Sequence, residues 1–111
     1  SDLGVRPIPE RIGYCPSKAG VIMLTKCIAL EYAPDIRVNA ILPGLVRTPM
    51  IEQRFTEAED PKALEEAYAS LYPLHKMGKI EDMANAIAFL SSDESGFITG
   101  EIMNVCGGSL I

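Results

Sequence analysis

A tyrosine and a lysine four residues apart, Tyr14 and Lys18, are the side chains of this sequence best suited to proton transfer. On a helix, residues four apart lie one above the other on the same face. A free phenol has a pKa of about 10 and is a poor acid at neutral pH, but a nearby ammonium group lowers the pKa of a phenol. The hydroxyl can then protonate a carbonyl oxygen or accept a proton from an alcohol. This pair therefore predicts an acid/base site at the start of a helix.

A second pair with the same spacing, Tyr72 and Lys76, shows that spacing alone is a weak signal. There, Pro73 follows the tyrosine directly and Gly78 lies just beyond the lysine. A helix that holds both side chains on one face is therefore not expected. The residues around each pair favour the first one as the chemical pair.

The composition is that of one globular domain, with 111 residues, 48% of them hydrophobic and 23% charged. The sequence has no run of about 18 apolar residues and no basic-then-apolar leader, so it predicts neither a membrane span nor a secretion signal. A net charge of −5 argues against nucleic acid or a membrane surface as the main partner. Three dispersed cysteines fit no metal motif. We expect free thiols in a reducing cytoplasm and no metal site.

The longest helical pattern runs from about residue 15 to residue 33 and is apolar on two faces. Val21, Leu24 and Ile28 form one stripe, and Met23 and Cys27 belong to a second. A helix that is apolar on more than one face is buried on more than one face. We therefore expect one face to pack within the domain and the other to meet a further layer or a partner subunit.

The rest of the chain predicts alternating strands and helices. Residues 36–42 are rich in branched side chains and predict a buried strand, residues 51–72 predict two polar helices, residues 80–90 an amphipathic helix, and residues 101–105 a last strand. This order predicts an α/β fold in which the two strands are parallel, with a right-handed crossover. Two parallel strands do not make a self-sufficient sheet. Because the chain also opens on a serine rather than a methionine, we expect it to be a processed product or a piece of something longer.

Five short motifs follow one another in a recognisable order and spacing. The first is Tyr-x-x-Ser-Lys at residues 14–18, with Ser1 thirteen residues before the tyrosine. The others are a strand that enters a Pro-Gly turn (37–44), Pro-Gly-x-Val-x-Thr-x-Met (43–50), Ile-Thr-Gly (98–100) and Val-Cys-Gly-Gly (105–108). Together they resemble the C-terminal part of the short-chain dehydrogenase/reductase family, which usually has aspartate at the position of Cys106. The resemblance implies the C-terminal portion of a Rossmann-type doubly wound parallel sheet, with two strands and three to four helices.

The resemblance implies a catalytic role for three residues. Tyr14 would be the general acid/base that protonates the carbonyl oxygen as hydride arrives at carbon. Lys18 would promote that proton transfer and hydrogen-bond the nicotinamide ribose, and Ser1 would orient the substrate carbonyl. The implied reaction is hydride transfer between NAD or NADP and a small-molecule carbonyl or secondary alcohol.

The resemblance also implies cofactor contacts, both from the catalytic pair and from the segment after the first strand. Pro43 and Gly44 would form the turn beside the nicotinamide. The backbone of Val46 would meet its carboxamide, and the Thr48 hydroxyl would meet the carboxamide or a phosphate. Thr48 is also a candidate N-cap of the next helix, and the two roles are compatible. Residues 49–76 would form a lid over the substrate.

The family's Gly-rich dinucleotide turn has no counterpart here. The resemblance therefore implies that residues 1–111 are the C-terminal catalytic portion of a single Rossmann-type domain, whose N-terminal half lies outside this chain. One hypothesis is an NAD(P)-dependent oxidoreductase. The alternative is an inactive fragment whose remaining property is subunit association, through the doubly apolar helix and the last strand. A homo-oligomer, either a dimer or a tetramer, is expected. Nothing in the sequence favours a stand-alone binding module.

Overall fold

The computed structural model describes all 111 residues, and its elements follow the predicted order. It contains four α-helices, two short strands and two short 3-10 helices. Their bounds are η1 (Asp2–Gly4), α1 (Tyr14–Tyr32), β1 (Ala40–Pro43), α2 (Pro49–Glu57), α3 (Pro61–Ser70), α4 (Ile80–Ser91), η2 (Asp93–Ser95) and β2 (Ile102–Val105).

The two strands form a parallel pair, as the sequence predicted, in a register that places Ala40 opposite Ile102. Strand β1 starts later than the predicted 36–42, and the residues before it are held mainly by side-chain hydrogen bonds, beside one backbone bond from Gly100 N–H to Val38 O at 2.8 Å. Arg37 donates to the carbonyl oxygens of Ser92 and Ile98. Asn39 exchanges two hydrogen bonds with the backbone of the same loop. The strand pair therefore begins only where these side-chain bonds end.

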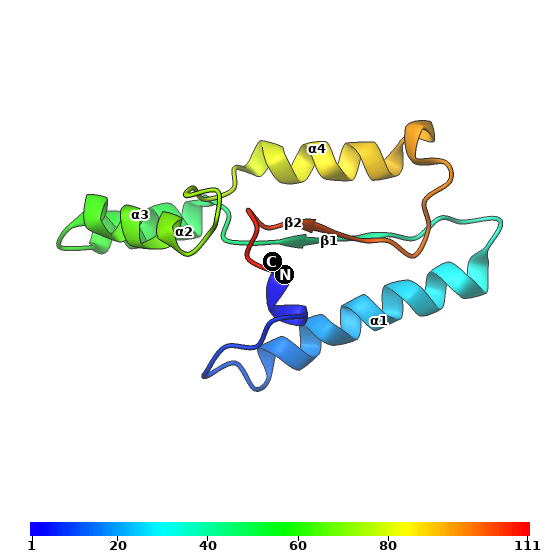
Figure 1. Cartoon of the computed structure of the whole chain (residues 1–111), viewed down its shortest axis with the longest axis horizontal. Helices are drawn as coiled ribbons and strands as arrows, with labels where there is room; N and C mark the ends of the chain where they lie inside the picture. Colours follow the sequence, from blue (N-terminus) through cyan, green and yellow to red (C-terminus); the bar gives the residue numbers. More distant parts are fainter.

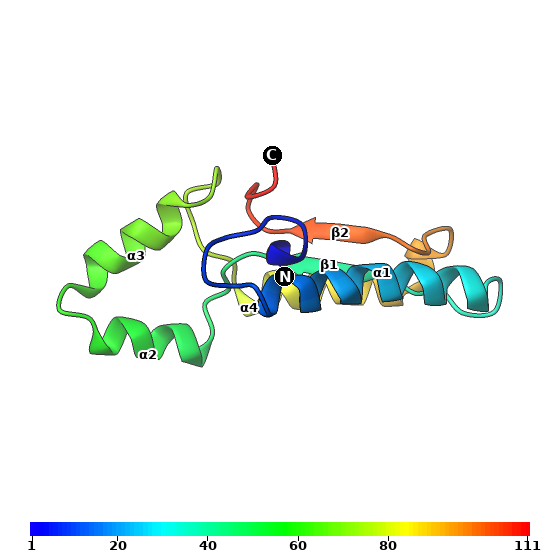
Figure 2. The same ribbon diagram turned by 90° about the horizontal axis from the view of Figure 1, so that it is seen from below.

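Helices α1 and α4 lie on opposite faces of the strand pair (Figures 1 and 2), which is the layer order of a doubly wound sheet. Helix α4 packs on both strands, and Leu42 of β1 is 1% exposed. Helix α1 is largely uncovered: only Thr25 and Ala29 are buried, and Leu30 is 84% exposed. Two short strands offer a helix of 19 residues little surface, and the expectation that its other face meets a further layer or a partner subunit stays a prediction. No helix in the structure has the length and apolar character needed to cross a membrane.

Helices α2 and α3 form an arm that extends away from the strand pair (Figure 2). Ile51 and Phe55 of α2 are buried with Met77, and the ring of Tyr68 in α3 lies 5.8 Å from that of Phe55. Proline opens both helices, and the Asp60 side chain caps α3. This arm comprises most of the segment predicted as a lid.

Candidate active site

The first turn of α1 brings the phenol of Tyr14 and the ammonium of Lys18 together. Tyr14 is the first residue of the helix, and Pro16 falls within the first turn, where no N–H partner is needed. The Nζ of Lys18 lies 5.3 Å from the centre of the tyrosine ring, within the range of a cation–π contact. The tyrosine side of the pair is open, with Tyr14 43% exposed. The spacing thus places the two groups on one face of the helix, as predicted.

Ser1 lies beside this pair because η1 packs closely on α1. A Cβ on Gly4 would lie 2.8 Å from Ile22 Cδ1 and 3.0 Å from the carbonyl carbon of Lys18, so only glycine allows this approach. The Ser1 hydroxyl oxygen accepts a hydrogen bond from Leu3 N–H at 3.2 Å, which leaves its hydrogen free to donate. Ser1, which caps η1, is therefore held beside the first turns of α1.

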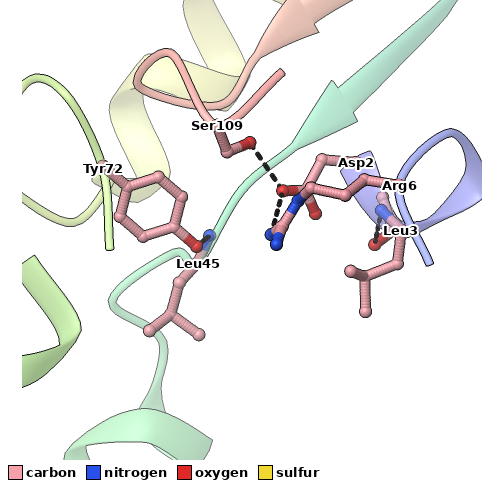
Figure 3. A network of polar contacts seen from close by, with 7 residues as sticks. Asp2, Leu3, Arg6, Leu45, Tyr72 and Ser109 are labelled. Carbon is pink, nitrogen blue, oxygen red and sulfur yellow. Dashed lines mark hydrogen bonds and ion pairs between the residues drawn. The ribbon is translucent and has the colours of Figure 1, made fainter. Parts of the chain in front are cut away.

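A buried carboxylate, Asp2, holds this segment against the end of the chain (Figure 3). Asp2 is 4% exposed, and its Oδ2 accepts hydrogen bonds from Ser109 Oγ at 2.6 Å and from Arg6 Nη2 at 3.3 Å. Sequence reasoning missed Asp2. Its only signal in the sequence is a carboxylate directly after a predicted catalytic serine, and its partner Ser109 lies 107 residues away.

The Pro43-Gly44 turn lies at the carboxyl end of β1, whose last residue is Pro43, and ligands of parallel sheets bind at such ends. The Gly44 N–H donates to Val105 O at 3.3 Å, which extends the contact with β2 into the turn. A Cβ on Gly44 would lie 3.0 Å from Tyr72 Cε1 and 3.1 Å from Cys106 Cα. The close approach of three segments therefore favours glycine here.

The next residues offer two unused hydrogen-bonding groups. The Leu45 carbonyl accepts from Gly78 N–H at 2.9 Å, and Arg47 N–H donates to Gly78 O at 2.8 Å. Between these bonds, the Val46 N–H has no partner in the chain. Thr48 is the N-cap residue of α2, but its side chain makes no capping hydrogen bond. A free N–H donor and a free hydroxyl acceptor fit the oxygen and the amino group of a carboxamide.

A cavity of about 520 Å³ lies next to this turn and is formed by the end of β2, the start of α4 and the loop after α3. It does not include the three catalytic candidates and shares only Gly44 with the predicted site. The residues that frame it are Gly44, Leu45, Tyr72, Met77, Asp82 and Gly108. This cavity therefore does not connect the cluster of Ser1, Tyr14 and Lys18 with the Pro43-Gly44 turn.

The sequence matches a known family over nearly its whole length. A family model described as Enoyl-(Acyl carrier protein) reductase matches residues 1–109. A 3-oxoacyl-[acyl-carrier-protein] reductase of Thermotoga maritima is 42% identical over 112 residues, which cover 100% of this chain and 43% of that protein. The chain spans less than half the length of the first curated relatives it matches, at 43%, 44% and 43% of three of them.

Solved structures agree with this match. The structure described as ElxO with NADP bound has a TM-score of 0.91 and 34% identity, covering 99% of this chain and 44% of that one. A 4-hydroxyisoleucine dehydrogenase complexed with NADH has a TM-score of 0.88 and 38% identity, again covering 99% of this chain and 44% of that one. These matches confirm that the fold is part of a Rossmann-type sheet. With its motifs, its fold and a family model that covers residues 1–109 all in agreement, the chain belongs to the short-chain dehydrogenase/reductase family.

Proposed function

We propose that this chain carries the proton-transfer part of a dinucleotide-dependent oxidoreductase that interconverts a carbonyl compound and a secondary alcohol. The observation that supports this most is the contact between the Tyr14 ring and Lys18 Nζ, 5.3 Å from the ring centre, beside the 3-10 helix that Ser1 caps. Similar solved structures hold NADP or NADH, which supports NAD or NADP as the cofactor. The bound nicotinamide supplies or accepts the hydride.

The residues of the chain handle the proton and hold the reacting oxygen. During reduction, the Tyr14 hydroxyl gives its proton to the carbonyl oxygen, and during oxidation it takes the proton back. The Lys18 ammonium stabilises the negative charge that remains on the phenol oxygen. The free hydrogen of the Ser1 hydroxyl donates to the same substrate oxygen and keeps it within reach of the tyrosine.

The segment after β1 would hold the nicotinamide end of the cofactor. Pro43 and Gly44 form its wall, the free N–H of Val46 donates to the carboxamide oxygen, and the free hydroxyl of Thr48 accepts from the carboxamide amino group. The arm α2–α3 and the loop after it would cover the substrate.

We also propose that residues 1–111 are the C-terminal catalytic portion of a single Rossmann-type domain completed by an N-terminal half. This is supported by relatives more than twice as long, and by the mostly uncovered helix α1. No specific observation favours the alternative, a fragment that serves only in subunit association. A homo-oligomeric assembly in the cytoplasm stays a prediction.

The test is to express the complete reading frame, measure the mass of the polypeptide, and follow nicotinamide absorbance with NADH or NADPH and a panel of ketones, aldehydes and 3-oxoacyl thioesters. A protein longer than 12.0 kDa should bind dinucleotide and oxidise it in the presence of one of these carbonyls. A longer protein that binds neither dinucleotide contradicts the proposed function. Turnover by a chain of 12.0 kDa contradicts only the proposal of a missing half.

A further inference from the structure

Tyr72 lies in a very different environment from Tyr14, although both have a lysine four residues later. It follows α3 in the loop that returns from the arm, and it is 7% exposed. Figure 3 shows its hydroxyl directed at the backbone nitrogen of Leu45. Burial raises the pKa of the Tyr72 phenol, while the hydrogen bond from Leu45 opposes this shift, so the hydroxyl is neutral at physiological pH. Tyr72 is therefore placed by its packing and is not an acid or a base at neutral pH.

The Tyr72 side chain joins three segments that are distant in sequence. Its hydroxyl oxygen accepts a hydrogen bond from Leu45 N–H at 2.8 Å, across 27 residues. One edge of its ring contacts Gly44, and a Cβ added to Gly44 would lie 3.0 Å from Tyr72 Cε1. The Cβ of Tyr72 faces Gly107, and a Cβ added to Gly107 would lie 3.4 Å from it. In the same loop, Leu74 N–H donates to Gly107 O at 3.2 Å. The loop after α3 is thus bonded both to the turn after β1 and to the turn after β2.

The hydrogen bond from Leu45 N–H to Tyr72 differs in kind from the other hydrogen bonds of the turn after β1. The N–H groups of Gly44, Leu45 and Arg47 are all bonded, and that of Val46 is free. Of the three bonded groups, only Leu45 N–H is held by a side chain, and that side chain comes from the base of the arm. A single hydroxyl group therefore fixes the peptide group that precedes the free donor.

We propose that Tyr72 is a positioning residue for the nicotinamide end of the dinucleotide. Through its hydroxyl it holds the peptide group that precedes the one carrying the Val46 N–H, while the bond from Gly78 N–H to Leu45 O holds the latter. Because Tyr72 follows α3, the order of this turn then depends on how the arm packs. The inference rests on the proposed function, in which Val46 N–H meets the carboxamide. Tyr72 lies outside every sequence motif that pointed to the candidate site.

The variant that isolates the hydroxyl is Tyr72→Phe, which keeps the ring in contact with Gly44. Tyr32→Phe is the matched control, because Tyr32 ends α1, is half-exposed and makes no side-chain hydrogen bond. Both are made in the complete protein, and the Kd for NADH and NADPH is measured by fluorescence titration alongside kcat, KM and Tm. For Tyr72→Phe we expect the dinucleotide Kd and KM to rise about tenfold, which is the effect of one net hydrogen bond. We expect kcat at saturating dinucleotide and carbonyl to stay close to that of the wild type, and Tyr32→Phe to change none of these values.

For Tyr72→Phe, a dinucleotide Kd equal to that of the wild type overturns the inference and leaves the proposed function in place. If kcat or Tm falls while the dinucleotide Kd stays unchanged, the role of the hydroxyl is merely structural. A wild-type protein that binds neither dinucleotide overturns the proposed function, and the inference with it.

Amide hydrogen exchange in the wild-type protein tests the same inference without any variant. The Leu45 amide should be protected before dinucleotide is added, because Tyr72 already accepts its hydrogen. The Val46 amide should exchange freely at first and become protected with NADH or NADPH. An unprotected Leu45 amide, or a Val46 amide that the dinucleotide does not affect, contradicts the inference.

Discussion

At the scale of single residues, the cluster of Ser1, Tyr14 and Lys18 depends on Gly4, which contributes no side chain of its own. Its backbone lies so close to α1 that a methyl group would meet both Ile22 and the backbone of Lys18. The distance between the predicted serine and the tyrosine–lysine pair is therefore set by a residue with no chemical role.

Gly4→Ala should destabilise the protein by about 1–3 kcal/mol, the usual cost of overpacking, and should lower kcat by moving Ser1. The control is Gly20→Ala on the exposed side of α1, where no atom lies within 4 Å of the new Cβ. The control should stabilise the helix by up to about 1 kcal/mol. Urea unfolding and steady-state kinetics measure both effects. Equal stability and equal kcat in Gly4→Ala and wild type would show that η1 does not set the position of the serine.

The stability of the folded protein should depend on pH through Tyr72. Burial raises the pKa of its phenol in the folded protein above the value of about 10 in the unfolded chain, with Asp2 adding to the shift and Arg6 opposing it. The folded state thus retains a proton that the unfolded chain loses. The stabilising contribution is complete below about pH 10 and is lost as the pH rises through the folded pKa. Urea unfolding between about pH 9 and about pH 11.5 should show a steeper loss of stability in wild type than in Tyr72→Phe. Parallel curves would contradict this assignment.

At the scale of elements, the arm α2–α3 is held at its base by Arg47. This guanidinium pairs with Glu52 of α2 and with Glu65 of α3, and lies over the ring of Phe55 at 5.3 Å from its centre. One side chain therefore connects both helices of the arm to the turn that offers the Val46 N–H.

Arg47→Met should loosen the arm and increase the rate of limited proteolysis within residues 51–70. The ion pairs are exposed, so high salt should weaken them in wild type and bring its rate of cleavage toward that of the variant. Arg54→Met is the control, because Arg54 lies on α2 and has no ion pair in the structure. Equal cleavage of wild type and Arg47→Met at low salt would show that Arg47 does not hold the arm.

The sequence predicts what depends on neighbours along the chain. The helical spacing of Tyr14 and Lys18, the proline at the start of α3 and the parallel strand pair all follow from local patterns. It does not predict contacts between distant segments, such as Asp2 with Ser109 or Tyr72 with Leu45, because periodicity says nothing of which loops meet. The proline after Tyr72 correctly indicated that this tyrosine is not on a helix, but gave no indication of what it would contact.

At the scale of the whole molecule, these residues form an open structure. Its radius of gyration is 15.9 Å, whereas a compact chain of about this length has about 13 Å. Helix α1, which carries the tyrosine–lysine pair, shows most of its apolar side chains to solvent, and the cavity of about 520 Å³ beside Gly44 does not reach Ser1, Tyr14 or Lys18. Both features agree with the proposal that an N-terminal half covers α1 and completes the site.

The most direct test of this account is the turnover of Tyr14→Phe in the complete protein, compared with its affinity for dinucleotide. The variant lacks the hydroxyl that transfers the proton but keeps the ring beneath Lys18. We predict that reduction of the carbonyl substrate falls by at least about a hundredfold, while the Kd for NADH or NADPH changes little. Turnover by Tyr14→Phe equal to that of wild type would contradict the account and remove this tyrosine from the reaction.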